Sequence, residues 1–570
     1  MTVAAGLLAS VVAQATPPGG CTVAPGGGRV SGLCSNANSL HIAVAYRSIL
    51  PVLVLSIGAL LLLAVSAVLP KRSWPGLYPL LTAVIGGASA IASAWEWTDL
   101  GTSNGHVSHA AVTIGQQILY DRFSVFFMLM ISIAVVLGAL ISDSYLRREG
   151  LDGVEAYVLM LMAGVGAMLM CESAGLIMLF LGLEIMSIAL YVMAAYHRRR
   201  TQSGEAGFKY FILGSFSSAI FLYGVALVYG ATGSTQFDEI AFYLARDTLT
   251  NGGVLLAGMA LLIVGLGFKV AAVPFHYWAP DVYQGSPTPF TGYMAAVAKA
   301  AGFAGLIRVL LEALPTQAAN WRPIIWLMAV LTLLVGSVMA IAQRDLKRML
   351  AYSSISQAGY VLVGLQAGTA YGTAGVLFYL FTYTFIIAGT FAVVQVIQGS
   401  GEARNDLGAI RGLARRQPYL AAAMLVLLLA QAGVPLTTGF LAKLYVIQAS
   451  VEQGQYVLAV IAMVAAAIAA FFYLRVALLM YSRGESTPAA VGVGTGPGSP
   501  AVDRSELAGL EPVASLDGPT ATATLEAPAE ERIEVPYLVA VALVICVVFT
   551  IAAGVSAPVI DFARHATTLF

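Results

Sequence analysis

The chain has 570 residues, of which 59% are hydrophobic and only 10% are charged. Soluble domains carry about 25% charged residues, so this composition excludes a soluble enzyme and indicates a multi-pass membrane protein. The 29 basic and 29 acidic residues balance, which leaves no basic surface for nucleic acid. The four cysteines, at positions 21, 34, 171 and 546, lack the C-x-x-C spacing of zinc and iron–sulfur sites.

Long apolar stretches predict an all-α fold with about fourteen transmembrane helices, because one crossing needs about 20 apolar residues. The first three spans are expected near residues 48–69, 77–94 and 123–142. The next five are expected near 156–171, 173–196, 208–231, 252–279 and 289–311. The last six are expected near 324–343, 349–368, 371–398, 418–449, 455–481 and 536–557.

Basic residues are concentrated in alternate loops between these spans. One set of loops contains 17 Lys and Arg side chains, whereas the other contains at most seven. Because cytoplasmic loops carry the excess of basic residues, the first set is predicted to be cytoplasmic. Both termini are then expected outside, which requires an even number of spans.

Two segments are expected to lie outside the helices. In the external segment 1–45, Met1–Ala15 resembles a signal peptide without its basic start, and it could be either cleaved or retained. Cys21 and Cys34 follow on the outside, where they could form a disulfide or stay free. Residues 483–535 are rich in Gly, Pro, Ala, Thr and Glu, so we expect a disordered cytoplasmic linker before the last helix, in 536–570.

Four of the six lysines lie inside predicted spans, where each costs about 2.5–3.5 kcal/mol at a helix centre. A carboxylate, Glu184, also lies in mid-span. Buried Lys and Glu can exchange protons near neutral pH, so these five side chains are candidate proton carriers. The lysines are Lys209, Lys269, Lys299 and Lys443.

Each of these charges also has a structural interpretation. Lys209 could extend its ammonium to the cytoplasmic surface, that is, snorkel. Lys269 and Lys299 lie too deep for that but could form structural ion pairs, and Lys443 lies near the outer end of its span. Arg308 and Arg475 are expected to snorkel.

Two prolines indicate broken helices. Pro274 interrupts the span that carries Lys269, and Pro435 interrupts the span that carries Lys443. Proline removes a helical hydrogen bond, and paired breaks in corresponding halves are typical of inverted-repeat transporters. We interpret His276 first as a hydrogen-bonding group at the first break and second as a candidate relay. The six histidines are scattered, so no metal site is expected.

Three sequence motifs resemble those of the antiporter-like subunits of respiratory complex I. They are Gly267–Pro289 (GFKVAAVPFHYWAPDVYQGSPTP), Asp345–Tyr360 (DLKRMLAYSSISQAGY), and Gly433–Pro435 followed by Gly439–Lys443 (GFLAK). The resemblance covers roughly residues 45–482 and the last span. The stretch DVYQG and the lysine at 443 are similar to the N-type paralogue, which corresponds to the mitochondrial second ND subunit. No long lateral helix follows the last span, which argues against the L-type paralogue.

The resemblance implies a proton-translocating subunit of NADH–quinone oxidoreductase, without a redox centre of its own. It implies spans one to three in residues 46–143 and two inverted five-helix repeats in 154–312 and 323–482. Glu184 and Lys269 would form the input pair, Lys299 the central relay and Lys443 the outlet, with Lys209 as an additional lysine. NADH, FMN, iron–sulfur clusters and quinone are expected in partner subunits. The M-type and the small K-type subunits are expected neighbours, in a bacterial inner membrane.

One residue departs from the family pattern. Gln357 stands where the family often has histidine, and glutamine can hold water but cannot carry a proton as a cation. A mechanism that needs histidine between Lys299 and Lys443 is therefore in doubt, and Gln357 remains a candidate relay. Two other functions stay open at this point. One is a subunit of a multi-subunit sodium–proton antiporter, and the other is a scaffold whose buried charges only fix the helix packing.

Overall fold

The computed structural model describes residues 46–68, 76–100, 111–246, 252–402, 405–482, 533–555 and 558–567. The predictions about a leader peptide, about Cys21 and Cys34, and about the linker up to residue 532 concern residues outside these ranges. The external position of both termini likewise concerns residues outside them.

Within the described residues, eleven helices are long and apolar enough to cross a membrane. They are α2 (Leu50–Val68, preceded by η1, Tyr46–Ile49), α3 (Leu77–Asp99), α4 (Arg122–Arg148), α6 (Leu176–Ala194), α7 (Thr201–Thr232), α9 (Gly252–Lys269), α11 (Thr288–Ile307), α12 (Ala318–Ile341), α14 (Ala370–Gln398), α18 (Tyr456–Tyr481) and α19 (Tyr537–Val555). Three more crossings are made by α5 (Glu155–Cys171), by α13 (Leu346–Ala367), and by α16 (Pro418–Ala432) together with α17 (Thr438–Glu452). The predicted all-α fold with about fourteen spans is confirmed.

Several short elements were not predicted, because they are too short or too polar to produce a hydrophobic pattern. They are the antiparallel pair β1 (Ala111–Thr113) and β2 (Ile118–Tyr120), the helices α8 (Phe237–Arg246), α10 (Trp278–Gly285), α15 (Leu413–Arg416) and α20 (Pro558–His565), the π-helix η2 (Arg308–Ala313), and the 3-10 turns η3 (Pro315–Gln317), η4 (Ser400–Glu402) and η5 (Leu407–Ile410).

The helices from α5 to α18 form two sets of five crossings with the same element order. The first set contains α5, α6, α7, the pair α9–α10, and α11, and the second contains α12, α13, α14, the pair α16–α17, and α18. In each set the fourth crossing is the broken one. Since five is odd, the second set starts from the opposite side of the membrane to the first.

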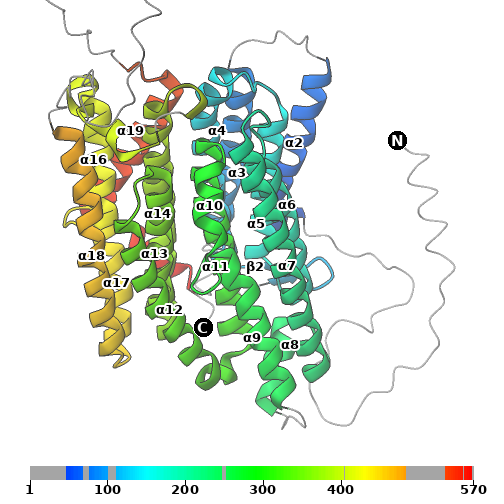
Figure 1. The fold of residues 1–570 in the computed structure, drawn as a ribbon. Helices are drawn as coiled ribbons and strands as arrows, with labels where there is room; N and C mark the ends of the chain where they lie inside the picture. The colour runs from blue at the N-terminus through cyan, green and yellow to red at the C-terminus, as the bar shows by residue number, and fades with distance from the viewer. Residues whose placement is uncertain are drawn as a thin grey trace, which may run out of the picture. The chain divides into compact units, whose positions relative to one another are not determined.

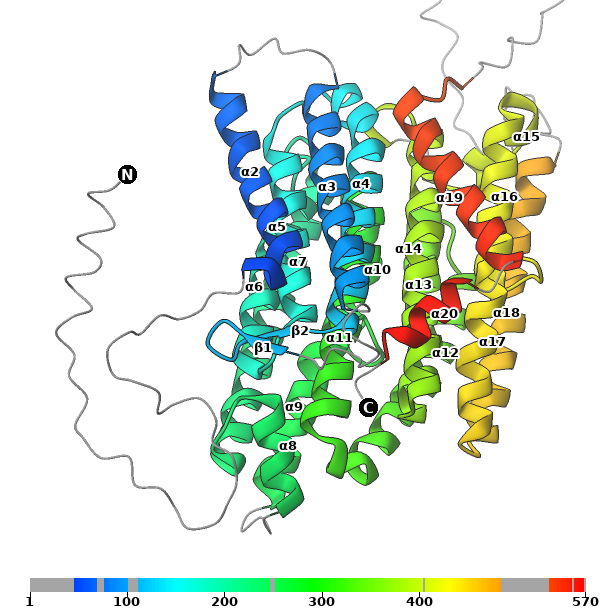
Figure 2. The same cartoon turned by 180° about the vertical axis from the view of Figure 1, so that it is seen from behind.

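Helices α11 and α14 bring the two sets together. They pack against each other, and the most apolar stretch of each helix is completely buried inside the protein. Figure 1 shows α16, α17 and α18 on one side of this pair and α2, α6 and α7 on the other. From behind, α2, α3 and α4 cover the first set, and α19 lies beside α14 (Figure 2). The side chains of α11 therefore face other helices rather than lipid.

Candidate functional site

The first helix break places Lys269 at the end of α9. Residues 270–277 turn before α10 begins at Trp278, and the Val273–Pro274 peptide bond is cis. The backbone groups released by the break find side-chain partners. The Val273 amide donates to Thr332 Oγ1 on α12 (2.9 Å), and Trp278 Nε1 donates to the Phe268 carbonyl (2.9 Å). An interrupted helix inside a membrane needs such replacement partners.

The ammonium of Lys269 is buried among hydroxyl groups. Its Nζ donates to Ser187 Oγ on α6 (2.8 Å) and to the Tyr210 hydroxyl on α7 (3.4 Å). The centres of the Tyr210 and Tyr191 rings lie 5.4 and 5.8 Å away, within the range of a cation–π attraction. These hydroxyls and rings can bind the ammonium although no carboxylate is paired with it.

Glu184 does not form the expected direct ion pair with Lys269. No such pair lies within 4.0 Å in the described part of the chain, and the lysine bonds to Ser187 instead. Ser187 is three residues after Glu184 on α6, and so lies on the same helix face. Glu184 is half-buried, and its Oε1 is buried without a hydrogen-bond partner from the described ranges. A carboxylate charge therefore acts on Lys269 from across Ser187.

Lys299 lies in the middle of α11 and bonds to one serine of α13. Its Nζ donates to the Ser354 carbonyl and to Ser354 Oγ (2.5 Å). The Tyr383 hydroxyl on α14 donates to the same Oγ (2.8 Å), and the Tyr283 hydroxyl lies 3.5 Å from it. Ser354 thus connects the buried lysine of the first set to helices of the second set.

Lys443 binds the helix end that the second break exposes. Its Nζ donates to the carbonyls of Gln431 (2.8 Å) and Ala432 (3.0 Å), the last two residues of α16. Carbonyls at a helix C-terminus lack intrahelical partners and carry partial negative charge. Gly433 ends the helix with a φ of 88°, which only glycine adopts readily. The break preceding Pro435 therefore builds the lysine's binding site.

Gln357 joins this site to α13 and α14. Its Nε2 donates to the Gln431 carbonyl (3.2 Å) and the Tyr473 hydroxyl (3.0 Å), and the Tyr379 hydroxyl donates to its Oε1. Gln357 lies three residues after Ser354, on the same face of α13. Among the described residues, Lys299 and Lys443 have no ion-pair partner, and Gln357 stands between them.

Between Lys269 and Lys299 the contacts are aromatic. The ring of Tyr210 stacks on Trp278 with centroids 4.5 Å apart, and Trp278 meets Tyr283 edge-on at 6.3 Å. Hydrogen bonds between described side chains do not join the two lysines. His276 is buried against Tyr277, and its Nδ1 has no partner among the described atoms. The structure brings His276 into contact with none of the lysines.

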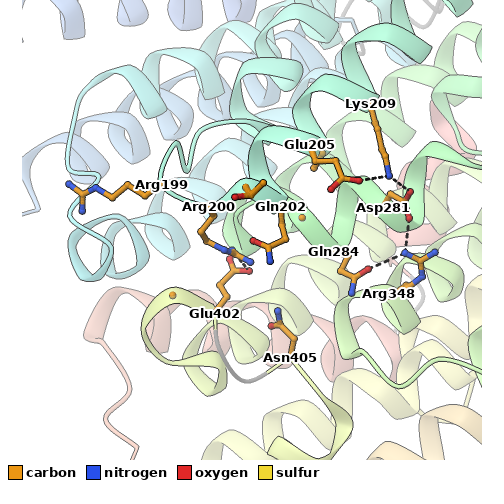
Figure 3. A pocket seen from close by; sticks show the side chains of 14 residues that line it. Arg199, Arg200, Gln202, Glu205, Lys209, Asp281, Gln284, Arg348, Glu402 and Asn405 are labelled. Atoms are coloured by element: carbon orange, nitrogen blue, oxygen red, sulfur yellow. Dashed lines mark hydrogen bonds and ion pairs between the residues drawn. The ribbon is translucent and has the colours of Figure 1, made fainter.

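Lys209 lies apart from the buried lysines, at a polar cavity of about 630 Å³. Its side chain is 39% exposed, as in the snorkelling interpretation, and its Nζ pairs with Glu205 (2.7 Å) and Asp281 (2.8 Å). Arg348 reaches the other oxygen of Asp281 (2.6 Å), also contacting Gln284 (3.0 Å). Figure 3 shows this line of alternating charges along one wall of the cavity.

A buried ion cluster closes the opposite wall of the cavity, and the sequence analysis missed it. Glu402 pairs with Lys347 (2.9 Å) and Arg200 (2.8 Å), and it accepts from the Thr288 amide (2.9 Å). Burial alone would raise the pKa of Glu402, but the two cations outweigh it and lower the pKa to about 2. The cluster ties α11 and the start of α7 to α13. Its members are far apart in the sequence and share no motif.

Arg308 corrects a second expectation. It was expected to snorkel, but its side chain is 0% exposed and pairs with Asp121 (2.8 Å) and Glu312. Its position near the end of a span suggested a route to water. Glu312 is four residues away, but Asp121 lies 187 residues earlier in the chain, so no local pattern could indicate the pair that buries Arg308.

The chain can now be compared with known proteins. The family described as NADH:quinone oxidoreductase/Mrp antiporter, TM, matches residues 173–469, which contain both helix breaks. A protein of Trichlorobacter lovleyi named NADH-quinone oxidoreductase subunit N is 42% identical over 449 residues, covering 79% of this chain and 90% of the relative. The chain belongs to the NADH-quinone oxidoreductase subunit N family. A relative of the same name from Parvibaculum lavamentivorans is 43% identical over 376 residues, covering 66% of this chain and 77% of the relative.

Chains of solved membrane complexes share the fold of this subunit. A chain of respiratory complex I from Thermus thermophilus with bound aureothin is 30% identical and has a TM-score of 0.67, covering 88% of this chain and 96% of that one. A chain of the Mrp complex from Dietzia sp. has a TM-score of 0.74 at 21% identity, covering 92% of this chain and 97% of that one, which shows a shared fold. The subunit is thus a multi-pass, proton-translocating membrane component of NADH–quinone oxidoreductase.

Proposed function

We propose that protons cross this subunit along Lys269, Lys299 and Lys443, with Gln357 and Ser354 between the last two. The observation that carries the proposal is the carbonyl of Gln431, which accepts from both Lys443 (2.8 Å) and Gln357 (3.2 Å). Three lysines buried in a membrane protein without a paired carboxylate are costly. Charges that a membrane protein keeps at such a cost are typically functional rather than structural.

Uptake is proposed to begin at the polar cavity. Lys209 lines the cavity, and the next residue of α7, Tyr210, provides the hydroxyl that Lys269 contacts. Two adjacent residues of α7 therefore connect the solvent-accessible charges of the cavity to the first buried lysine. Glu184 is proposed to favour the protonated form of Lys269 through Coulomb attraction across Ser187. When that attraction weakens, the proton passes toward Lys299.

The aromatic stretch between Lys269 and Lys299 requires water for transfer. Tyr210, Trp278 and Tyr283 separate the two ammonium groups, and Tyr283 approaches Ser354 Oγ at 3.5 Å. Because a stacked ring carries no proton, we propose that transient hydration beside the turn at 270–277 completes this step. His276 then keeps a structural role at the break, since it contacts none of the lysines.

We also propose the setting of the subunit. NADH, FMN, iron–sulfur clusters and quinone would reside in partner subunits, so that this chain contributes only proton transfer. Its neighbours would be the M-type antiporter-like subunit and the small K-type subunit. The membrane would be a bacterial inner membrane, with the polar cavity facing the cytoplasm, because Arg199, Arg200 and Arg348 lie at that end.

The test uses membrane vesicles containing the whole complex. Lys269→Ala, Lys299→Ala and Lys443→Ala should each lower NADH-driven proton uptake several-fold and slow NADH oxidation, because coupled steps share one barrier. Arg415→Ala removes an exposed cation that makes no ion pair among the described residues, so it is the matched control and should leave both rates unchanged. If all three lysine variants assemble and keep full rates, the lysines are structural and the proposed path is wrong.

A further inference from the structure

A second group of buried charges lies at the opposite end of α11 from the polar cavity. It surrounds Arg308, which follows the last residue of α11 and is 0% exposed. Lys299 is nine residues earlier on the same helix, so the two side chains start about 13 Å apart along its axis. The proton path proposed above does not use this group.

Arg308 has no donor to spare. Its Nε donates to the Cys171 carbonyl (3.1 Å), and Nη2 donates to Asp121 Oδ1 (2.9 Å) and Ser124 Oγ (2.8 Å). Its Nη1 donates to Asp121 Oδ2 (2.8 Å) and to Glu312. A guanidinium has five N–H donors, and all five are in use. Asp121 alone already balances its single charge, and Glu312 is a second carboxyl in contact with it.

Two further carboxyls lie beside this group without a partner in the part of the chain that the structure describes. Glu96, in the last turn of α3, and Glu172, which follows α5, are each 0% exposed. None of their four carboxyl oxygens has a hydrogen-bond partner among the described residues. The backbone of Glu172 is fixed, because its carbonyl accepts from the Leu119 amide (2.7 Å). The two side chains are close enough to interact electrostatically.

The surrounding charges do not compensate these two carboxyls. The groups that act on Glu96 are Arg47, Asp99 and Tyr120, and Arg47 is already paired with Asp99 (2.8 Å). The groups that act on Glu172 are Glu96, Arg308 and Asp121. An ionised carboxylate that is buried without a donor is strongly disfavoured. Two such carboxyls side by side cannot both be ionised, because like charges repel.

We infer that Glu96 and Glu172 form a proton-holding site at the end of the first five-helix set remote from the polar cavity. The inference rests on the proposed function, because it gives these carboxyls a role in proton release on the side opposite to uptake, in addition to the path through Lys443. The ligand is the proton itself. Arg308, held in place by Asp121 and Glu312, keeps a positive charge nearby that assists loss of a proton from Glu172.

The first test asks whether the two carboxyls carry protons in the assembled complex. Infrared spectra of the purified complex at neutral pH should contain carboxylic-acid carbonyl bands that are missing in Glu96→Gln and Glu172→Gln. These bands should shift in heavy water, and their intensity should change when NADH starts turnover. Glutamine has the shape of a protonated glutamate, so the fold is expected to persist. Spectra in which neither variant loses a band would overturn the inference.

The second test measures proton output in vesicles. The double variant Glu96→Gln/Glu172→Gln should lower output several-fold, whereas Asp238→Asn, an exposed carboxylate on α8, should not. Wild-type output from the double variant would overturn the inference even if the infrared bands are present, because the protons would be held but not passed on. Lys299→Ala in the same assay separates the two proposals. If it too has no effect, the proposed path fails, whereas an effect of Lys299→Ala alone rejects only the holding site.

Discussion

Lys443 and Gln357 donate to the same backbone oxygen, the carbonyl of Gln431, at 2.8 and 3.2 Å. The lysine comes from α17, the glutamine from α13 and the carbonyl from the last turn of α16. A charged and a neutral donor therefore share one acceptor at a helix end. Any change in the protonation of Lys443 alters the strength of the bond that Gln357 makes.

Gln357→His is expected to leave activity within a few-fold of wild type. The glutamine already connects Tyr379, Tyr473 and the Gln431 carbonyl, and a hydrated path through these groups should conduct without a cationic carrier. Histidine would add an alternative carrier. The measurement is proton uptake per NADH oxidised in vesicles. A clear rise in that ratio would show that Gln357 limits transfer, against our interpretation.

Gly433→Ala should weaken the Lys443 site. A Cβ at this position would lie 3.0 Å from Lys443 Cδ, and its φ of 88° costs a non-glycine residue about 1–2 kcal/mol. Gly454→Ala is the matched control, because φ is 70° there but a Cβ would meet nothing within 4 Å. Both variants should lower thermal stability, while only Gly433→Ala should also lower proton uptake. Equal uptake in the two variants would contradict the role of the helix end.

Arg308→Met should destabilise the subunit by about 3–5 kcal/mol, because it leaves Asp121 buried without its cation. Replacing both, as Arg308→Met/Asp121→Leu, should recover part of the loss. The measurement is the thermal unfolding midpoint of the purified complex. Arg475→Met, whose side chain is exposed, provides the comparison. If Arg308→Met and Arg475→Met unfold at the same temperature, the buried Arg308–Asp121 pair stabilises the subunit no more than an exposed arginine does.

Glu402 should produce an acid-dependent loss of stability. Its pKa falls from 4.5 to about 2 on folding, so the carboxylate form is favoured in the folded state. The stabilisation, roughly 3 kcal/mol by linkage, is complete above about pH 5 and is lost as the pH falls toward 2. Stability against pH should therefore differ between wild type and Glu402→Gln at neutral pH and converge in acid. If wild type and Glu402→Gln differ in stability by the same amount at every pH, ionisation of Glu402 does not stabilise the fold.

Single cysteines at Ser499 and Thr568 should label from opposite sides of the membrane. Residue 499 lies in the segment that the basic-residue asymmetry assigns to the cytoplasm, and residue 568 follows one more crossing, α19. A membrane-impermeant thiol reagent applied to intact cells and to inverted vesicles makes the distinction. Labelling of both positions from the same side would reject the proposed orientation.

Sequence alone identified the buried lysines, because a charge inside an apolar run is visible without any knowledge of packing. The helix breaks were visible for a similar reason, since proline stands inside two apolar runs. The partners of these charges were not visible. Ser354, the Gln431 carbonyl and Glu402 acquire their roles only when α11, α13 and α16 meet. The direct Glu184–Lys269 pair was expected from depth in the membrane, but depth does not determine which side chain of α6 faces the lysine.

The burial of α11 has a consequence for how the subunit is made. Membrane helices insert one after another and associate afterwards, so Lys299 enters the bilayer before Ser354, its acceptor 55 residues later, has been synthesised. During that interval the ammonium has lipid, water and the earlier helices around it but lacks this acceptor, and a lysine at a helix centre costs about 2.5–3.5 kcal/mol. The remaining apolar residues of α11 must help to offset this cost. Biogenesis therefore limits how polar this helix can become, although none of its side chains faces lipid in the finished protein.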